Sequence, residues 1–284
     1  MRAGLRRGAS MGDLREHLLS KAQGDLLAWA DQQAAAETHG VTVSQVEEIA
    51  LEAGLLPARY QRNRKTLSTA DQLKLFRSEV AVIGCGGLGG YIVEELARLG
   101  VGRLKAIDPD VFEEHNLNRQ LMSTIAALGR PKVESTSARV AQINPAVQVL
   151  PFRDRFCREN GKSLLSGADV AVDALDNITT RLELADVCAD LGIPLVHGSI
   201  AGWYGQVVTQ FPGEHTLQTI YGRCADGAGV EKHLGNPSYT PAVVASLEVA
   251  EVCKILLGLG TPITGAMLVI NLLDMEFSKF KICR

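Results

Sequence analysis

A glycine-rich hexapeptide has the spacing most typical of ligand binding in this sequence. Gly84, Gly86, Gly87 and Gly89 belong to the string GCGGLG, which follows an apolar run at 80–83 and precedes a helical pattern. Glycines let the backbone approach a ligand, and a helix N-terminus offers free N–H groups to phosphate. We therefore predict a nucleotide-binding loop. Taken alone, the spacing also suits NAD or FAD, or a tight turn that binds nothing.

Charged residues follow the next predicted strand, at 104–107. Asp108 stands where a carboxylate accepts hydrogen bonds from ribose hydroxyls in such folds, and Arg119 and Lys132 come further along the chain. A hydride-transfer enzyme has little use for two cations beside its adenosine site. A triphosphate needs them, because negative charge develops as pyrophosphate leaves. The two cations favour phosphoryl chemistry over hydride chemistry.

A second acidic position ends the predicted strand at 170–174. Asp173 and Asp176 lie at the carboxyl edge of the predicted sheet, where ligands of doubly wound folds bind. A carboxylate there can hold Mg²⁺ against the phosphates. Asp176 alone suits equally well the N-cap of a helix that begins near Thr179.

Short apolar runs alternate with helical periods from residue 79 onward, which is typical of a parallel sheet. We predict strands at 80–83, 104–107, 147–150, 170–174, 195–197 and 207–211. A long loop is expected at 212–238, then a helix at 242–257 capped by Thr240 and Pro241, then two strands within 267–282. The predicted fold class is α/β, a Rossmann-like doubly wound, mostly parallel sheet with flanking helices.

Residues 1–57 are predicted to form an N-terminal helical extension, and residues 58–284 the main domain. We expect one helix over 13–39 and a second that starts at a capping box at 44–47. No Lys or Arg occurs at 22–58, so a DNA-reading role is disfavoured because a recognition helix would repel phosphates. We interpret the extension as a packing or docking arm.

The composition bounds the class of protein and its partners. The chain is 46% hydrophobic and 21% charged, which is typical of a soluble globular protein. A formal net charge of -3 gives no reason to expect nucleic acid or a membrane as partner. No apolar run reaches the ~20 residues of a membrane span, and the N-terminus does not resemble a secretory signal.

The six cysteines are widely spaced, and no C-x-x-C pair occurs. This spacing argues against a four-cysteine metal site, and we predict no structural zinc. Cys85, Cys188 and Cys253 lie in apolar patterns and are expected to be buried thiols of a reducing compartment, which favours a cytoplasmic location.

Taken in one order, the motifs resemble the E1-like activating family of MoeB, ThiF and HesA. The strings are G-x-G-G-x-G, D-x-D-x-V, N-x-N-R-Q, G-x-P-K and D-x-x-D-N, within a resemblance that runs from Arg59 to Lys254. The resemblance implies a homodimer that uses Mg·ATP to adenylate the C-terminal Gly-Gly carboxylate of a ubiquitin-like sulfur-carrier protein, ThiS- or MoaD-like, with release of pyrophosphate.

The resemblance also implies residue roles. Asp108 would bind the ribose, Asn116, Arg119 and Lys132 the phosphates, and Asp176 the magnesium. The implied nucleotide-binding set is Gly84, Gly86, Gly87, Gly89, Asp108, Asp110, Asn116, Arg119, Gln120, Lys132, Asp176 and Asn177.

Three further positions come from the same resemblance. Arg62 would reach the ATP of the neighbouring subunit; without the resemblance it reads as a solvated charge. Cys224 stands where some relatives place a cysteine that takes part in sulfur transfer, although an incidental exposed cysteine fits as well. His197 to Ser199 and residues 202–207 resemble the segment beside the incoming peptide tail.

Other functions remain open from the sequence. An NAD-dependent oxidoreductase is disfavoured by the two cations, and a noncatalytic module that binds a ubiquitin-like protein is disfavoured because every expected catalytic position is filled. Activation of a small molecule or an RNA base stays possible within the family. Nothing in the sequence separates a thiamin-type from a molybdopterin-type carrier.

Overall fold

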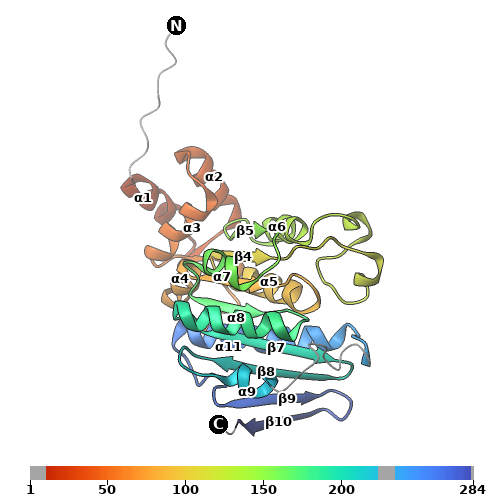
Figure 1. The fold of residues 1–284 in the computed structure, drawn as a ribbon. Coiled ribbons are helices and arrows are strands. Elements are labelled where there is room, and N and C mark those ends of the chain that lie inside the picture. The colour runs from red at the N-terminus through yellow and green to blue at the C-terminus, as the bar shows by residue number, and fades with distance from the viewer. Residues whose placement is uncertain (1–10, 223–233, 283–284) are drawn as a thin grey trace.

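The computed structural model describes residues 11–222 and 234–282, and an eight-stranded sheet forms its body (Figure 1). The strand order is β10-β9-β8-β7-β6-β3-β4-β5. The strand bounds are β3 Glu79–Ile83, β4 Arg103–Ile107, β5 Gln148–Phe152, β6 Val170–Asp173, β7 Leu195–Ala201, β8 Tyr204–Gln210, β9 Ala266–Asn271 and β10 Glu276–Lys281. Strands β5, β4, β3, β6 and β7 pair in parallel, and β7 to β10 pair antiparallel. The predicted α/β fold is confirmed.

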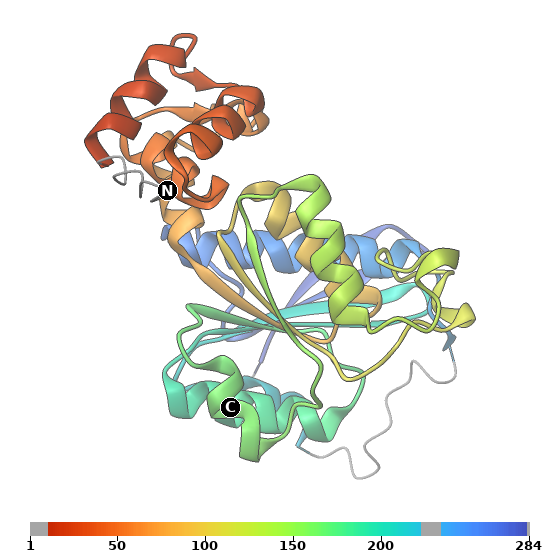
Figure 2. The same ribbon diagram turned by 90° about the horizontal axis from the view of Figure 1, so that it is seen from above.

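Helices cover both faces of this sheet, and Figure 2 shows the sheet between the two helical layers. The first layer contains α4 Thr69–Arg77, α5 Gly87–Leu99, α6 Lys132–Ile143 and α11 Tyr239–Leu257. The second contains α7 Arg158–Leu165, α8 Ile178–Leu191 and α9 Thr216–Tyr221. Three short 3-10 helices are η1 Ala58–Tyr60, η2 Glu114–Asn116 and η3 Ile125–Ala127. Within the described ranges, no helix has both the length and the apolar character that crossing a membrane requires.

Strand β3 shows why the central strands appear in the sequence as continuous apolar runs. Val80 and Val82 pack into the core on the α5 and α11 side, whereas Ala81 and Ile83 pack on the α7 and α8 side. Because both faces are covered, successive side chains are all buried and the usual alternation disappears.

The N-terminal extension has its own apolar cluster, which includes Leu14, Leu18, Leu27 and Val46. Its elements are α1 Met11–Lys21, β1 Leu26–Leu27, α2 Trp29–His39, α3 Val43–Glu52 and β2 Leu56–Pro57. The single helix predicted over 13–39 is wrong. Helix α1 ends at Lys21, Gly24 with its φ of 64° lies in a turn in which Leu26 N donates to Gln23 O at 3.2 Å, and β1 pairs in parallel with β2.

The capping box of α3 lies two residues earlier than predicted. Gln45 N donates to Thr42 Oγ1 at 3.2 Å, and Thr42 N donates to Gln45 Oε1 at 2.9 Å. The predicted box at Ser44 and Glu47 is therefore wrong. The Glu47 side chain is fully buried and turns toward the main body, where it forms an ion pair with Arg59.

Two expectations in the C-terminal half also need correction. Helix α9 lies inside the stretch that was predicted as a loop over 212–238. Helix α11 begins at Tyr239, earlier than predicted, and Thr240 does not cap it. The Thr240 hydroxyl donates instead to Gly202 O at 2.6 Å, which fixes the helix start to the β7–β8 turn.

Four cysteines fall within the described residues, and all four are free thiols: Cys85, Cys157, Cys188 and Cys253. Cys85 and Cys188 are buried as predicted, whereas Cys253 is only half-buried.

Candidate active site

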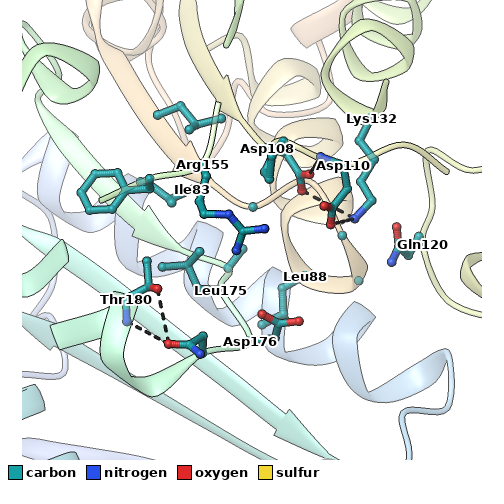
Figure 3. Close-up of a pocket in the computed structure, with 18 of the residues that line it drawn as sticks. Ile83, Leu88, Asp108, Asp110, Gln120, Lys132, Arg155, Leu175, Asp176 and Thr180 are labelled. Carbon is teal, nitrogen blue, oxygen red and sulfur yellow. Dashed lines mark hydrogen bonds and ion pairs between the residues drawn. The ribbon is translucent and has the colours of Figure 1, made fainter. Parts of the chain in front are cut away.

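The carboxyl ends of β3, β4, β5 and β6 meet around a pocket of about 380 Å³ (Figure 3). Most residues of the predicted nucleotide-binding set line it: Gly84, Gly86, Gly87, Asp108, Asp110, Arg119, Gln120, Lys132, Asp176 and Asn177. The pocket lies where the chain order reverses, because β3 pairs with β4 on one side and with β6 on the other. This switch point is where ligands bind in open α/β sheets.

The glycine loop requires glycine at two positions for steric reasons. Gly84 has a φ of 100°, and a Cβ there would lie 2.5 Å from Ala174 O. A Cβ on Gly89 would lie 1.8 Å from Gly84 O, so Gly89 lets α5 start against β3 without itself lining the pocket. At Gly86 and Gly87 a Cβ would project toward Gln120 and Arg119, at 3.6 and 3.7 Å. These two glycines keep the surface open for a ligand.

Asp108 follows β4 and is almost fully buried. Its Oδ2 accepts from Cys85 N at 2.7 Å, and its Oδ1 accepts from Asp110 N at 2.8 Å. The carboxylate thus ties the glycine loop to the end of β4. Burial raises the pKa of this carboxyl, and the Lys132 ammonium opposes the shift.

Lys132 is the first residue of α6, and its ammonium is buried between two carboxylates. Its Nζ donates to Asp110 Oδ2 at 3.0 Å and lies 3.8 Å from Asp108 Oδ2. An anionic ligand in the pocket would compete for this ammonium with the more exposed Asp110.

The turn at η2 presents a second cation and an amide to the glycine loop. Asn116 is buried and does not line the pocket; its Oδ1 accepts from Glu113 N at 2.9 Å, and its backbone oxygen accepts from Arg119 N and Gln120 N. Asn116 therefore shapes the turn. Arg119 Nη1 donates to Asn118 Oδ1 at 2.8 Å, which holds the guanidinium on this turn, with its Nε beside Gly87.

Gln120 carries a buried polar atom that its surroundings leave unpaired. Its Oε1 is removed from solvent and has no hydrogen-bond partner among the described residues. A buried oxygen without a donor is costly, and a ligand with a suitable donor would satisfy it. The pocket therefore suits a ligand that has both hydrogen-bond donors and negative charge.

Asp176 and Asn177 follow β6 and line the pocket. Figure 3 shows Asp176 on the other side of the pocket from the pair formed by Asp110 and Lys132. Asn177 is the N-cap of α8, since its Oδ1 accepts from Thr180 N at 3.0 Å. The alternative of Asp176 as the N-cap is therefore wrong. Asp176 is exposed, and no hydrogen bond joins its carboxylate to any described residue. This carboxylate is available to a ligand or a metal ion.

Sequence reasoning missed several residues of the pocket. Arg155 is exposed, and Figure 3 shows its guanidinium pointing into the pocket, which Asp154 and Phe156 also line. The signal was present, because these residues come within a few positions of the end of the strand predicted at 147–150, and strand ends carry ligand contacts. No motif marked three further residues that line the pocket: Thr180 and Arg181 of α8, and Asn236.

A second pocket of about 250 Å³ adjoins the first, and Arg181 and Ile200 line both. Its wall is mostly apolar and takes polar atoms from Ser199, Gln206 and Tyr221. The segment that resembles the family's tail-binding strand thus contributes directly to this pocket.

Two predicted residues lie elsewhere. Arg62 is exposed, lines neither pocket and makes no ion pair within the described part of the chain. Cys224 lies outside the described residues. The same part of the chain holds no group of three or more His, Cys, Asp or Glu side chains that could bind a metal ion without a further ligand.

Comparison with curated proteins finds relatives of known name. A SAMP-activating enzyme E1 of Haloferax volcanii is 38% identical over 208 residues, which are 72% of this chain and 77% of that protein. A sulfur carrier protein adenylyltransferase of Thermus thermophilus is 37% identical over 75% of this chain and 82% of its own length. The adenylyltransferase and sulfurtransferase MOCS3 of Xenopus laevis is 34% identical; this chain spans only 49% of that protein.

Solved structures show the same fold at low sequence identity. MccB of E. coli crystallised with ATP superposes with a TM-score of 0.65 at 20% identity, covering 89% of this chain and 83% of that chain. The crystal structure of PaaA gives a TM-score of 0.67 at 20% identity, over 80% and 82% of the two chains. The family model described as ThiF family matches residues 60–284, and the chain therefore belongs to the ThiF family.

Proposed function

We propose that this chain is an ATP-dependent adenylyltransferase that activates the C-terminal carboxylate of a ubiquitin-like sulfur-carrier protein. The observation that carries the proposal is the pocket at the switch point, where the glycine loop, Arg119 and Lys132 meet opposite the unpaired Asp176. Membership of the ThiF family implies the use of ATP. Two relatives are named for activating SAMP and a sulfur carrier protein, which supports the substrate class.

The proposed reaction joins a carboxylate oxygen of the carrier to the α-phosphorus of ATP while the bond to pyrophosphate breaks. No nucleophile from the protein is required, so the residues act by positioning and by charge. Arg119 and Lys132 would neutralise the leaving pyrophosphate, and Asp108 would accept from the ribose hydroxyls. Arg155 adds a third cation on the opposite wall.

Asp176 would hold Mg²⁺ together with phosphate oxygens, because the described residues offer no complete set of protein ligands there. When bound, the ion would draw charge from the phosphates and orient them. We also propose that the chain carries no structural zinc, as the absence of a C-x-x-C pair suggests; metal analysis of the purified protein would check this.

The second pocket would receive the carrier tail. Its position suits this role, because it adjoins the nucleotide pocket and Arg181 and Ile200 line both. A tail that ends in Gly-Gly has no side chains at its last two residues, so it could pass between Arg181 and Ile200, which line both pockets. Its carboxylate would then lie beside the nucleotide.

We further propose that the enzyme is a homodimer in which Arg62 reaches the ATP of the neighbouring subunit. In one subunit Arg62 is exposed and apart from the pocket, so a role in the reaction requires a second copy. The reaction would take place in the cytoplasm.

ATP–pyrophosphate exchange tests the proposed function. Purified protein with Mg²⁺ should catalyse exchange only when a carrier that ends in Gly-Gly is added, and the ThiS- or MoaD-like protein that supports exchange would identify the pathway. Absence of exchange with every carrier, in protein that still binds ATP, would overturn the proposal. Hydride transfer to NAD, followed by absorbance, would instead support the oxidoreductase alternative.

Replacing Asp176 tests the predicted magnesium ligand. Asp176→Asn should lower the exchange rate by about 10²-fold or more, since the lost charge would otherwise hold the ion on the phosphates. The side chain is exposed and has no partner in the described ranges, so thermal stability should not change. Full exchange activity in Asp176→Asn would remove this residue from the mechanism.

A further inference from the structure

Three hydrogen-bonded side chains lead from the buried sheet to the wall of the second pocket. Asp173 ends β6, His197 lies on β7, and Tyr221 ends α9. His197 Nδ1 lies 2.7 Å from Asp173 Oδ2, and His197 Nε2 lies 3.0 Å from the Tyr221 hydroxyl. Asp173 and His197 are 0% and 1% exposed, whereas Tyr221 lines the pocket. One end of this hydrogen-bonded series is thus buried, and the other faces the second pocket.

The surroundings fix the direction of these hydrogen bonds. Asp173 accepts from Leu175 N at 2.9 Å, and Arg181 Nε lies 3.7 Å from its Oδ2, so an ionised carboxylate is stabilised. A carboxylate only accepts, and the His197 proton therefore resides on Nδ1. Burial lowers the pKa of His197, although Asp173 opposes the shift. A neutral imidazole then turns its Nε2 lone pair toward the Tyr221 hydroxyl.

The Tyr221 oxygen is also held from the pocket side. Gln206 Nε2 donates to it, while Ser199 Oγ and Arg181 Nη1 lie 3.4 Å away. The two long contacts leave the oxygen able to accept a proton from a ligand in the pocket. The guanidinium of Arg181 also lies 5.7 Å from the Tyr221 ring centroid, which favours negative charge on the ring.

Two further titratable groups pack near Asp173, His197 and Tyr221. Cys188 on α8 is buried near Asp173, and these two effects raise the pKa of its thiol to about 12. Glu248 on α11 packs against Gly198, the residue after His197, and burial raises the pKa of its carboxyl well above the ordinary value.

The adenylation step does not require proton transfer by Asp173, His197 and Tyr221. The terminal carboxylate of a carrier is already ionised, since an α-carboxyl group has a pKa of about 3.3–3.7, and its attack on ATP releases no proton. The acyl-adenylate that results must be consumed by a nucleophile. When that nucleophile is a thiol or a persulfide, it loses a proton as it attacks.

We propose that Asp173, His197 and Tyr221 form a proton relay for the step that consumes the acyl-adenylate. A sulfur of the thiol or persulfide class bonds to the acyl carbon, the bond from that carbon to the AMP oxygen breaks, and the electron pair leaves on AMP. The proton of the attacking sulfur passes to the Tyr221 oxygen while the Tyr221 hydroxyl proton passes to His197 Nε2. Asp173 stabilises the imidazolium. The relay rests on the proposed adenylyltransferase function.

In this relay Tyr221 is the catalytic residue, and His197 and Asp173 act through it. General base catalysis contributes about 10²- to 10⁴-fold in enzymes. The relay is needed only while the nucleophile is protonated. Above the thiol pKa of about 8.5, the thiolate attacks without a base.

Comparing two tyrosines, one inside the pocket and one outside it, tests the relay. Tyr221→Phe removes the relay hydroxyl, and Tyr91→Phe removes a hydroxyl on α5 that lines neither pocket and makes no hydrogen bond with the described residues. Acyl-adenylate formed on the carrier is mixed with a short peptide that contains one cysteine, whose thiol has a pKa of about 8.5, and AMP release is followed from pH 6.5 to 9.5. Pyrophosphate exchange is measured in parallel as the readout of adenylation.

We expect Tyr221→Phe to lower thiolysis at pH 7 about 10²-fold more than it lowers exchange, with the difference vanishing above pH 9. Tyr91→Phe should match the wild type at every pH. Loss that is equal at all pH values, or that affects exchange equally, would show a structural role and overturn the relay. His197→Asn should repeat the pattern of Tyr221→Phe.

The wild-type enzyme provides a test that needs no variant. Its thiolysis rate should fall less steeply below pH 8.5 than the thiolate fraction does, because the relay deprotonates the thiol. A rate that follows the thiolate fraction alone would also overturn the relay. If the thiolysis rate follows the thiolate fraction while exchange is normal, only the relay is wrong and the proposed adenylyltransferase function is retained. If exchange is absent, both proposals are wrong.

Discussion

Glu248 lies in the middle of α11 with its carboxyl group completely buried. Both oxygens lack a hydrogen-bond partner among the described residues, and a Cβ on Gly198 would lie 2.3 Å from Glu248 Cδ, so the carboxyl group is packed tightly against β7. Burial raises the pKa of Glu248 well above 4.5, Asp173 adds to the rise, and Arg181 opposes it. Burial in the folded protein therefore favours the protonated, neutral form of this acid.

Glu248→Gln should stabilise the protein at neutral pH. Above pH 4.5 the unfolded chain releases this proton while the folded chain keeps it, so the free energy of unfolding falls by about 1.4 kcal/mol per pH unit until the folded pKa is reached. Glutamine removes this term. We expect a gain of about 1–3 kcal/mol at pH 7.5 and none near pH 4, measured by urea unfolding at both pH values.

A glutamate one turn further along α11 provides the control. Glu251 accepts from Thr209 Oγ1 at 2.8 Å and from Ile263 N at 2.6 Å, and pairs with Lys254. Glu251→Gln should lose about 1–3 kcal/mol at pH 7.5, because its buried partners need the charge. A loss of stability in Glu248→Gln at pH 7.5 would show that this carboxyl is ionised.

Single residues of the nucleotide pocket could be predicted where a motif fixes their position along the chain. Asp108, Lys132 and Asp176 each follow a strand or a short string with set spacing, so the fold brings them together once the strand order is known. Tyr221 could not be predicted in this way. It reaches the site through α9, an element too short to show a helical period.

At the scale of elements, a buried polar network fastens the N-terminal extension to the main domain. Arg59 in η1 pairs with Glu47 of α3 and donates to Gln32 of α2 at 3.1 Å and to Asn144 at 3.1 Å. Tyr60 donates to Glu47 at 2.7 Å and accepts from Asn144 Nδ2 at 2.8 Å. Elements from both parts of the chain thus share one set of hydrogen bonds.

Removing the centre of this network should cost far more than removing a neighbouring surface charge. Glu47→Ala leaves Arg59 and the Tyr60 hydroxyl without their partner in a buried site, and we expect a loss of about 3–5 kcal/mol. Glu48, the next residue, pairs with Arg77 at 2.9 Å on the surface, and Glu48→Ala should lose less than about 1 kcal/mol. Urea unfolding measures both, and equal losses would contradict the assigned role of the network.

The elements of the main domain were predictable because their strands are buried on both faces and give long apolar runs. The extension was predicted less well, for a physical reason. Its helices α1 and α2 have no strong apolar face. The break between them depends on the pairing of β1 with β2, and these two strands lie some thirty positions apart in the sequence. Glu47 was misplaced for a similar reason, since its partner Arg59 belongs to another element.

At the scale of the whole molecule, the proposed role of Arg62 would require two subunits to make one active site. The residue follows η1, is exposed and lines neither pocket of its own chain. In a two-fold symmetric dimer each subunit can supply this guanidinium to the other, so each site would contain residues of both chains. The fold of one subunit does not identify the surface that would contact a second subunit, because no sequence motif marks that surface.

Mixing two inactive variants would test this arrangement. Arg62→Ala and Asp176→Ala should each abolish exchange as pure dimers. In a hybrid dimer, the Arg62→Ala subunit keeps its own Asp176 and receives Arg62 from the other subunit, so one complete site forms. After subunit exchange, about half of the dimers are hybrids with one site of two, which predicts recovery of about a quarter of the wild-type activity. If Arg62 acted within its own chain, every site in the mixture would lack one residue and no activity would return.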